Sequence, residues 1–422
     1  MAENVLIRIA VIGGGVAGAT VANALFQLGN MDVFMYESAS EFSERGAAVG
    51  LAGQAQLALQ QAIPLAQELL RKAGAVPMNS SHLLLGSGPA AGTVIVDLED
   101  DGSCEVIVHR ASLLRELLAP FPQERLHASK KLIDITVMED ESLEIRFEDG
   151  TSDRFDAVVG ADGIFSSVRN HVLGDAAAEH VPTPAGFWDC RVLVPFDKAS
   201  STLGKKHFEV DRQYGWIGDG AFIMHDILEN RTTIQCIISG VEKDPPKNRK
   251  RPLTREFLTD ILGTWLDGPI AKGAIDLVLD QPDPQGYSQW EHKSTPTYAN
   301  GRVCIVGDAA HATSPWQGAG AGQAFEDAVV LGTLLGKITR PQDIGAAFKA
   351  FDTVRRPRCQ RIIDSSRDTG EVLCGVKKAV ALDPGKLLGA LVDRWTFILT
   401  FDLEEHKREA LEKMEEFKMS LE

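Results

Sequence analysis

Residues 7–26 of the chain are IRIAVIGGGVAGATVANALF. The mostly apolar run at 7–12 is typical of a strand that is buried on both faces in a parallel sheet. The segment after the glycines, from about residue 18 to 28, has the spacing of a helix. A strand, a G-x-G-x-x-G turn and a helix in this order predict the opening of a dinucleotide-binding fold.

Each part of this turn has its own task. Gly13 makes the tight turn, Gly15 lets the backbone approach a pyrophosphate, and Gly18 lets the helix pack closely on the strand. Val16 and Ala17 lie between the last two glycines of the turn. The N-terminus of the helix that follows offers amide donors and a partial positive charge to phosphates. The alternative is a glycine turn that binds no ligand.

A carboxylate follows the second predicted strand. This strand is expected at 32–36, and Glu37 comes directly after it. Glu37 is placed to accept hydrogen bonds from ribose hydroxyls, and it would repel a phosphate at the ribose 2′ position. The tightly bound nucleotide is therefore expected to be NAD or FAD.

A second glycine-rich stretch favours FAD. Residues 303–311 are VCIVGDAAH and residues 314–322 are SPWQGAGAG. Asp308 ends a buried strand, where it can accept hydrogen bonds from a polyol such as the ribityl chain. A helix starting near Gly322 can face the flavin pyrimidine edge and stabilise the negative charge of the reduced ring. A second phosphate loop is the alternative, but the stretch does not match G-x-x-x-x-G-K-[ST].

These stretches resemble class A flavin-dependent monooxygenases, the group that includes salicylate and para-hydroxybenzoate hydroxylases. Residues 303–311 resemble the GD motif of that family, residues 160–169 (GADGIFSSVR) its DG motif, and residues 109–113 (HRASL) an H-R-x-x-L element whose arginine lies near FAD. Residues 45–50 resemble the flavin-approach loop. The segments 355–358 and 401–404 resemble the C-terminal pattern of salicylate-hydroxylase-like members, so the resemblance spans nearly the whole chain.

The motifs and the resemblance together name a set of site residues. Trp188-Asp189-Cys190-Arg191 resembles a segment whose arginine meets the substrate oxygen in relatives, and His225 stands where relatives often have a tyrosine or histidine facing the flavin. The expected catalytic residues are Arg191, His225 and Pro315. The expected cofactor-binding residues are Gly13, Gly15, Val16, Ala17, Gly18, Glu37, Arg45, Ala48, Arg110, Asp162, Asp308, Gly318, Gly320, Ala321 and Gly322.

Several of these residues have simpler interpretations, which stay open here. Asp162 could cap the helix that begins near Ser166, and Arg45 could be a surface arginine. Arg191 could pair with Asp189, and His225 could be a core histidine.

Residues near the second glycine-rich stretch have local interpretations as well. Trp316, where many relatives carry histidine, could stack on a substrate or pack in a wall. His311 is expected to pack rather than act as a base. Glu326 and Asp327 are expected to stabilise a helix dipole.

The expected fold is α/β: a Rossmann-like FAD-binding domain with an inserted antiparallel substrate sheet and a C-terminal helical region. The pattern of predicted secondary structure changes near residue 186. Short β-like runs separated by turn residues replace the alternation of strands and helices from there on. We expect the FAD-binding domain at 1–180 and 291–370, the substrate domain at 181–290, and the helical region at 371–422.

The resemblance also implies the reaction. NAD(P)H, which has no second glycine fingerprint and should bind transiently, reduces FAD; O2 then gives a C4a-hydroperoxide that hydroxylates an electron-rich phenolic or indolic ring. An FAD-dependent oxidase or dehydrogenase on the same fold is one alternative. A catalytically silent FAD-fold binding protein is the other.

Composition limits the partners. The 422 residues carry a formal net charge of -16, which disfavours nucleic acid and anionic membranes. The cysteines form no C-x-x-C pair, which excludes zinc ribbons and dithiol redox motifs. No metal site is expected. We expect a cytoplasmic monomer or homodimer that acts on a small aromatic substrate and O2.

Overall fold

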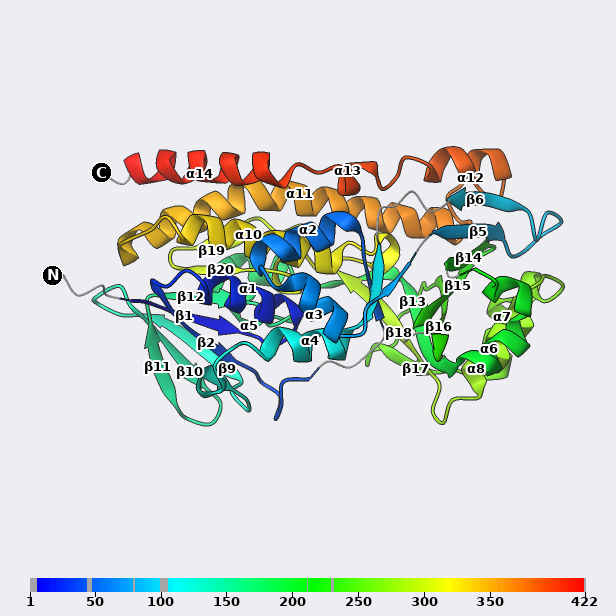
Figure 1. The fold of residues 1–422 in the computed structure, drawn as a ribbon, viewed down its shortest axis with the longest axis horizontal. Helices are drawn as coiled ribbons and strands as arrows, with labels where there is room; N and C mark the ends of the chain where they lie inside the picture. Colours follow the sequence, from blue (N-terminus) through cyan, green and yellow to red (C-terminus); the bar gives the residue numbers. More distant parts are fainter. Residues whose placement is uncertain are drawn as a thin grey trace.

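The computed structural model describes residues 6–43, 48–78, 80–98, 105–210, 212–228 and 231–420. Its first layer is a six-stranded sheet (Figure 1), parallel except for its edge hairpin. Apolar strands such as β1 are buried on both faces, by helices on one face and largely by an antiparallel meander on the other. In spatial order the strands are β19 (Ala299–Asn300), β20 (Val303–Ile305), β12 (Ala157–Gly160), β1 (Ile7–Ile12), β2 (Met31–Tyr36) and β8 (Leu126–His127).

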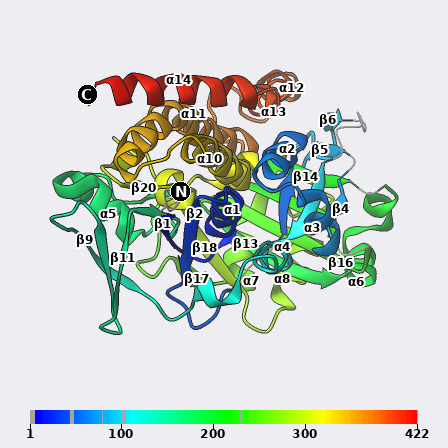
Figure 2. The same cartoon turned by 60° about the vertical axis from the view of Figure 1, so that its left-hand side comes forward.

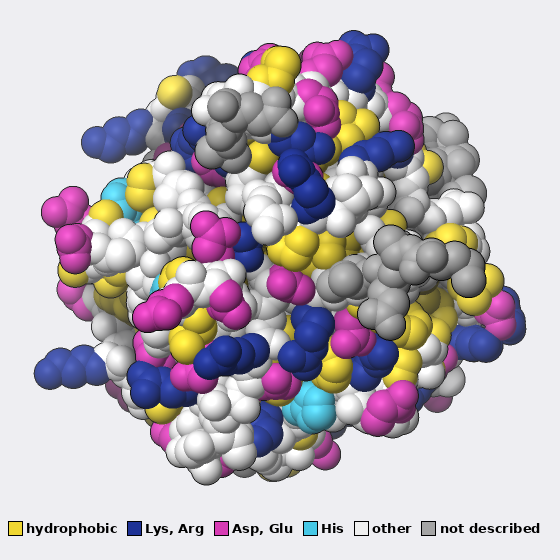
Figure 3. All heavy atoms as spheres, turned by 90° about the vertical axis from the view of Figure 1, so that its left-hand side faces the viewer, with side chains coloured by type: hydrophobic (Ala, Val, Ile, Leu, Met, Phe, Trp, Pro, Cys, Tyr) yellow, Lys and Arg dark blue, Asp and Glu magenta, His cyan; other side chains and the backbone are white. Residues whose placement is uncertain are grey.

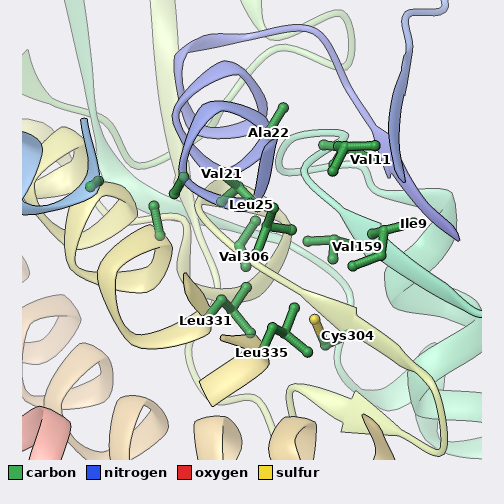
Figure 4. Packing of buried hydrophobic residues seen from close by; sticks show 14 of the residues in the cluster. Ile9, Val11, Val21, Ala22, Leu25, Val159, Cys304, Val306, Leu331 and Leu335 are labelled. Carbon is green, nitrogen blue, oxygen red and sulfur yellow. The ribbon is translucent and has the colours of Figure 1, made fainter. Parts of the chain in front are cut away.

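Several helices of this domain pack on the sheet. Figure 4 shows apolar side chains of β1, β12 and the β20 segment pointing toward those of α1 and α10, among them Val11, Val159 and Leu331. The first strand, glycine turn and helix therefore lie where the sequence predicts them. The helices are α1 (Val16–Phe26), α2 (Gly53–Ala62), α3 (Ala66–Lys72), α4 (Arg110–Leu118), α5 (Ser167–Leu173), α9 (Asp308–His311) and α10 (Gly320–Leu335).

The second layer is an eight-stranded, mostly antiparallel sheet. Its outer face packs on three helices through a core that includes Trp188, Trp216 and Trp265. In spatial order its strands are β17 (Lys250–Pro252), β18 (Gln285–Glu291), β13 (Thr183–Pro195), β16 (Thr233–Val241), β15 (Ala221–Leu228), β14 (Gln213–Gly218), β5 (Ser81–Leu85) and β6 (Val94–Leu98), and the helices are α6 (Phe196–Leu203), α7 (Arg255–Ile261) and α8 (Ala271–Leu279).

Two of the expected domain boundaries need correction. Strands β5 and β6 lie in the first expected domain by sequence, yet they extend the substrate sheet, because β5 pairs in parallel with β14. The boundary at residue 370 falls inside α11 (Ile344–Leu373), which is one continuous helix. Not all of the segment expected to contain short strands is β-structure, since Lys205–Phe208 forms a 3-10 turn.

The chain ends in helices that lie along one side of the molecule, with α14 over α11 and α10 (Figure 2). Helix α14 is amphipathic: Leu403, His406, Ala410 and Met414 are buried at helical spacing. The helical C-terminal region is thus confirmed. Its elements are α12 (Pro384–Leu391), α13 (Thr396–Leu399) and α14 (Leu403–Met419).

Two three-stranded sheets complete the fold. One is a meander at an end of the molecule, and the other carries the approach strand β3 next to β7. Seen from that end, side chains of both charges lie between small apolar areas (Figure 3). The strands are β9 (Leu132–Val137), β10 (Leu143–Phe147) and β11 (Ser152–Phe155), then β3 (Ala48–Leu51), β7 (Val106–His109) and β4 (Val76–Pro77).

Candidate active site

Three glycine-containing turns meet at the carboxyl ends of β1, β12 and β20. A Cβ atom on Gly13 would lie 2.2 Å from the carbonyl oxygen of Ala161, which precedes Asp162. A Cβ atom on Gly307 would lie 2.8 Å from that of Ala17. Neighbouring parallel strands place their following turns at one edge of the sheet, and this edge is where open α/β sheets bind ligands.

The first turn is shaped to receive an anion. Gly13 has φ +112°, and Gly18 is so close to the Gly13 carbonyl oxygen that a Cβ atom would lie 2.0 Å from it. The N-cap of α1 is Gly15, which has no side chain to bond the amides of the first turn. No side chain therefore caps the start of α1, where amides are predicted to bind a pyrophosphate. That contact stays a prediction.

Glu37 reaches this turn from the end of β2. Its Oε2 accepts a hydrogen bond from the Gly14 amide at 2.7 Å, and its Oε1 accepts one from the Ala39 amide at 2.7 Å. These contacts hold the carboxylate beside the glycine turn. The ribose role of Glu37 stays a prediction.

Asp162 of the DG motif has the capping role that the sequence left open. Its carboxylate accepts the amides of Ser167 at 2.7 Å and Val168 at 3.2 Å, at the start of α5, and the Ser166 hydroxyl. Burial raises the pKa of this carboxyl, which these donors oppose. Contact of Asp162 with a cofactor stays a prediction.

Arg169, at the end of the DG motif, was not singled out from the sequence. Its side chain is 2% exposed, and its Nη1 donates to the carbonyl oxygens of Ala309 at 3.1 Å and Ala310 at 3.2 Å. Within the described ranges no carboxylate pairs with it, and burial lowers its pKa to about 10. Arg169 thus ties the DG motif to the GD motif by charge-assisted hydrogen bonds.

The GD motif exposes one polar side chain in a buried setting. Gly307 and Ala309 are buried, whereas Asp308 between them is exposed at the start of α9. Pro315 is also exposed, and α10 starts at Gly320, near the position predicted. Gly318, Gly320, Ala321 and Gly322 form the turn and the first residues of α10, whose N-cap Ala319 is apolar.

A buried charged cluster lies behind the GD motif. Arg355 donates from Nε to Asp327 at 2.8 Å and from Nη1 to Glu326 at 2.6 Å, and His311 bonds Asp327 at 2.6 Å. The expectation that Glu326 and Asp327 serve mainly the dipole of α10 is therefore wrong: both are ion-pair partners. His311, Asp327 and Cys359 offer ligand atoms within 4.8 Å of one another, but Arg355 already contacts both Asp327 and Cys359.

Strand β3 brings two more of the predicted site residues, Ala48 and Arg110, near each other. Ala48 in β3 pairs with His109, and Arg110 follows His109 as the first residue of α4. Arg45 lies outside the described residues. The amide of Ala48 donates to Oε1 of Gln235 at 3.0 Å, which joins this strand to the substrate sheet.

That contact identifies the face of the substrate sheet that looks toward the first domain. Gln235 pairs with Asp226 on β15, and side chains two positions apart share a face. Met224 on β15, Ile237 on β16 and Arg191 on β13 therefore lie in one row across this face. The sheet presents an arginine beside apolar side chains toward the site.

Arg191 has the neighbour that the sequence suggested. Its Nη2 lies 3.3 Å from Oδ2 of Asp189, which also accepts from Gln289 at 3.0 Å. The Arg191 side chain is nevertheless 32% exposed. The pairing therefore leaves part of the guanidinium accessible.

His225 does not join this row. It lies on the opposite face of β15, parallel to the ring of Tyr214 at 5.3 Å and stacked on Phe208 at 4.6 Å. It is 0% exposed, and burial lowers its pKa to about 3. Its assignment to the flavin-facing site is corrected, because the pleat turns odd-numbered residues of β15 away: His225 is a core histidine.

Trp316 packs between the GD loop and the substrate sheet. Its ring meets Phe187 edge-on at 5.0 Å and Phe222 at 6.1 Å, and it is 8% exposed. These contacts join the GD loop to the inward face of the substrate sheet. The structure favours the packing interpretation of Trp316.

Asp226 and Gln235 on the inward face were also missed. Asp226 accepts from Gln213 at 3.0 Å and from Gln235 at 3.2 Å, and burial raises its pKa. Polar residues within the apolar strands β15 and β16 could have indicated a polar contact between the strands. Only the strand register shows that Asp226 and Gln235 are the residues that meet.

Comparison with known proteins identifies the family of this chain. Residues 7–366 match the family model described as FAD binding domain. The 6-methylsalicylate 1-monooxygenase of Aspergillus terreus is 34% identical over 96% of this chain and 92% of its own length, and the salicylate hydroxylase of Pseudomonas putida is 29% identical over 96% and 94%. A solved salicylate hydroxylase substrate complex has a TM-score of 0.83 at 25% identity, covering 97% of this chain and 98% of the other.

The chain belongs to the FAD binding domain family and is an FAD-dependent monooxygenase. The resemblance to salicylate hydroxylases, drawn from the motifs, is confirmed. In the part of the chain that the structure describes, no helix combines the length and apolarity needed to cross a membrane.

Proposed function

We propose that this monooxygenase hydroxylates a small phenolic carboxylate, with NAD(P)H as the reductant of FAD. The observation that carries the proposal is the accessible Arg191 guanidinium in an apolar row on the face of the substrate sheet that looks toward the GD loop. The names of the relatives, 6-methylsalicylate 1-monooxygenase and salicylate hydroxylase, support this substrate class.

The residues present fit FAD. The uncapped start of α1 would hold the pyrophosphate, Glu37 the adenosine ribose, and the exposed Asp308 the ribityl hydroxyls. The start of α10 would face the pyrimidine edge. When bound, FAD supplies the redox chemistry that transfers one oxygen atom of O2 to the ring.

The chain would bind and orient the substrate. The Arg191 cation favours the ionised form of a substrate oxygen, because an opposite charge nearby lowers its pKa. Met224 and Ile237, beside it, would exclude water from the apolar ring. Asp189 would have to share Arg191 with the substrate. The row is therefore expected to favour a flat ring that carries an anionic oxygen.

NAD(P)H would bind transiently. The G-x-G-x-x-G pattern at 13–18 is assigned to FAD, and Glu37 at its side disfavours a 2′-phosphate there. We expect an aromatic substrate to accelerate NAD(P)H oxidation, since ligand-driven movements commonly complete such sites.

The test is an oxygen-transfer assay with the purified holoprotein. Hydroxybenzoates and related phenols are screened for faster NAD(P)H oxidation, and the product is analysed after reaction under 18O2. We expect one labelled oxygen atom in the product and little flavin in the Asp308→Ala variant. Substrate turnover that forms hydrogen peroxide without label in the product would show an oxidase instead.

A further inference from the structure

The carboxylate of Asp327 holds both ends of the short helix that carries Asp308. Asp327 is 0% exposed on α10. Its Oδ2 accepts the Gly307 amide at 2.9 Å, directly before Asp308, and bonds Nε2 of His311 at 2.6 Å, at the last residue of α9. Its Oδ1 accepts from Nε of Arg355 at 2.8 Å.

The charges in this cluster support ionised Asp327. Burial opposes its ionisation, but the charges of His311 and Arg355 outweigh burial and hold the pKa of Asp327 at about 2. Burial also opposes protonation of His311, whereas Cys359 and Asp327 beside the ring raise its pKa well above the usual range. A buried ion pair is a weak source of stability compared with apolar packing, so its place at the GD motif points to a role in geometry.

A second buried charge reaches the same helix from the other side. Arg169 donates to the carbonyl oxygens of Ala309 and Ala310, while Asp327 accepts from Gly307 and His311. One amide, two carbonyl oxygens and the imidazole of this segment are thus bound to charged side chains. Asp308 is the exposed residue of this helix.

We propose that Asp327 is a positioning residue for flavin binding, which acts by fixing the Gly307 turn and α9 so that Asp308 meets the ribityl chain. The inference rests on the proposed contact of Asp308 with FAD. Asp327 itself would touch no cofactor atom. Its contribution passes entirely through Asp308, and this makes a double-mutant cycle decisive.

The cycle uses apoprotein titrated with FAD and followed by flavin fluorescence. The variants are Asp327→Asn, Asp308→Ala and the two combined. We expect Asp327→Asn alone to weaken FAD binding about ten- to hundredfold, the range for a charge-assisted contact. In the Asp308→Ala background the same change should have little further effect.

Asp352→Asn is the matched control. Asp352 is a buried acid of α11 that accepts hydrogen bonds from the amide of Tyr298 at 2.8 Å and from Arg356 at 2.8 Å. Among the described residues, no hydrogen bond joins it to the GD turn. We expect Asp352→Asn to lower stability like Asp327→Asn and to leave the FAD dissociation constant unchanged. The visible circular dichroism of the bound flavin should change only in the Asp327 variant.

The outcomes separate this inference from the proposed function. If Asp308→Ala binds FAD normally, the contact of Asp308 with FAD is wrong, and the role of Asp327 falls with it. If Asp308→Ala weakens binding but the effects of the two changes add, Asp308 keeps its role and the positioning role of Asp327 is refuted. Should Asp327→Asn not fold, His311→Gln and Arg355→Lys replace it in the same cycle, with the same criteria.

Discussion

A Cβ atom placed on Gly307 would lie 2.8 Å from the Cβ atom of Ala17. The turn of the GD motif thus rests directly on the first turn of α1, although the two residues are far apart in the sequence. Gly307 also has φ +56°, a conformation that side chains rarely adopt. The contact joins the two segments that are predicted to bind opposite parts of the same cofactor.

Gly307→Ala should therefore damage flavin binding. The backbone of Gly307, with φ 56° and ψ -143°, alone costs about 1–3 kcal/mol for a non-glycine residue. The added methyl group would also push the GD turn away from α1. We expect at least about a tenfold increase in the FAD dissociation constant, measured by titration of the apoprotein.

Ala17→Gly provides the compensating change. Removing the Ala17 methyl group relieves the steric contact but not the backbone cost, so the double variant should recover part of the lost affinity. An affinity identical to that of Gly307→Ala alone would show that the contact between the two turns does not limit binding.

Arg191→Ala should uncouple the reaction. The variant should keep its FAD and still oxidise NAD(P)H, but release more hydrogen peroxide per NAD(P)H because the substrate is held less well. A charge-assisted contact is worth about 1.5–3 kcal/mol, so hydroxylation efficiency should fall about ten- to hundredfold. Product and peroxide are measured in the same reaction.

Arg255→Ala is the control for this experiment. Arg255 also pairs with an acid of the substrate domain, Asp276 at 2.8 Å, but its side chain is 64% exposed and belongs to α7 on the outer face. Coupling should be unchanged in this variant. Equal peroxide release from both variants would remove Arg191 from the substrate site.

His225 should influence acid stability rather than catalysis. Burial lowers its pKa to about 3 from a usual 6.5, so the unfolded chain binds one more proton at this residue below about pH 6.5. Proton uptake by the unfolded chain does not lower the free energy of unfolding above that pH. As the pH falls below it, the free energy of unfolding decreases, by about 2 kcal/mol at pH 5. His225→Phe should reduce the pH dependence of the free energy of unfolding by about one proton, measured by urea unfolding at several pH values.

The same variant tests the correction made for His225. Because the ring lies on the outer face of β15, His225→Phe should hydroxylate with unchanged coupling. His207, whose pKa burial lowers to about 4, titrates in the same cluster and remains present in both proteins. Equal pH dependence in parent and variant would contradict the buried neutral state.

Arg358→Ala should loosen the C-terminal helices. Arg358 bonds both carboxylate oxygens of Glu326 at 2.7 Å, and its guanidinium lies 3.3 Å from the ring centroid of Phe401. Glu326 keeps its ion pair with Arg355 in this variant, so the loss is that of a charge-assisted contact, about 1.5–3 kcal/mol. We expect a lower melting temperature and faster proteolysis after residue 396, whereas Arg408→Ala, at an exposed pair, should change neither.

Local patterns of the sequence were enough to predict the cofactor and to locate the turns that are expected to bind it. The strand, glycine turn and helix at 7–26, Glu37 after β2 and the glycines before α10 are short-range features, because a turn or a helix start depends on a few consecutive residues. The family resemblance followed from three such motifs in order, and the fold class with it.

The tertiary structure decided the rest, because the contacts involved join distant segments. The alternation of side chains assigns Arg191 and His225 to particular faces of their strands, but it does not say which face packs on the first domain. The packing of β13 and β15 shows that Arg191 faces the first domain and that His225 faces away from it. The pairing of β5 with β14 and the ion pair of Asp327 with Arg355 also join segments that are distant in the sequence, so no local pattern predicts them. By itself the sequence determined the cofactor class and the order of the motifs, which are local properties. Which side chains meet was decided by strand register and helix packing, which no local pattern contains.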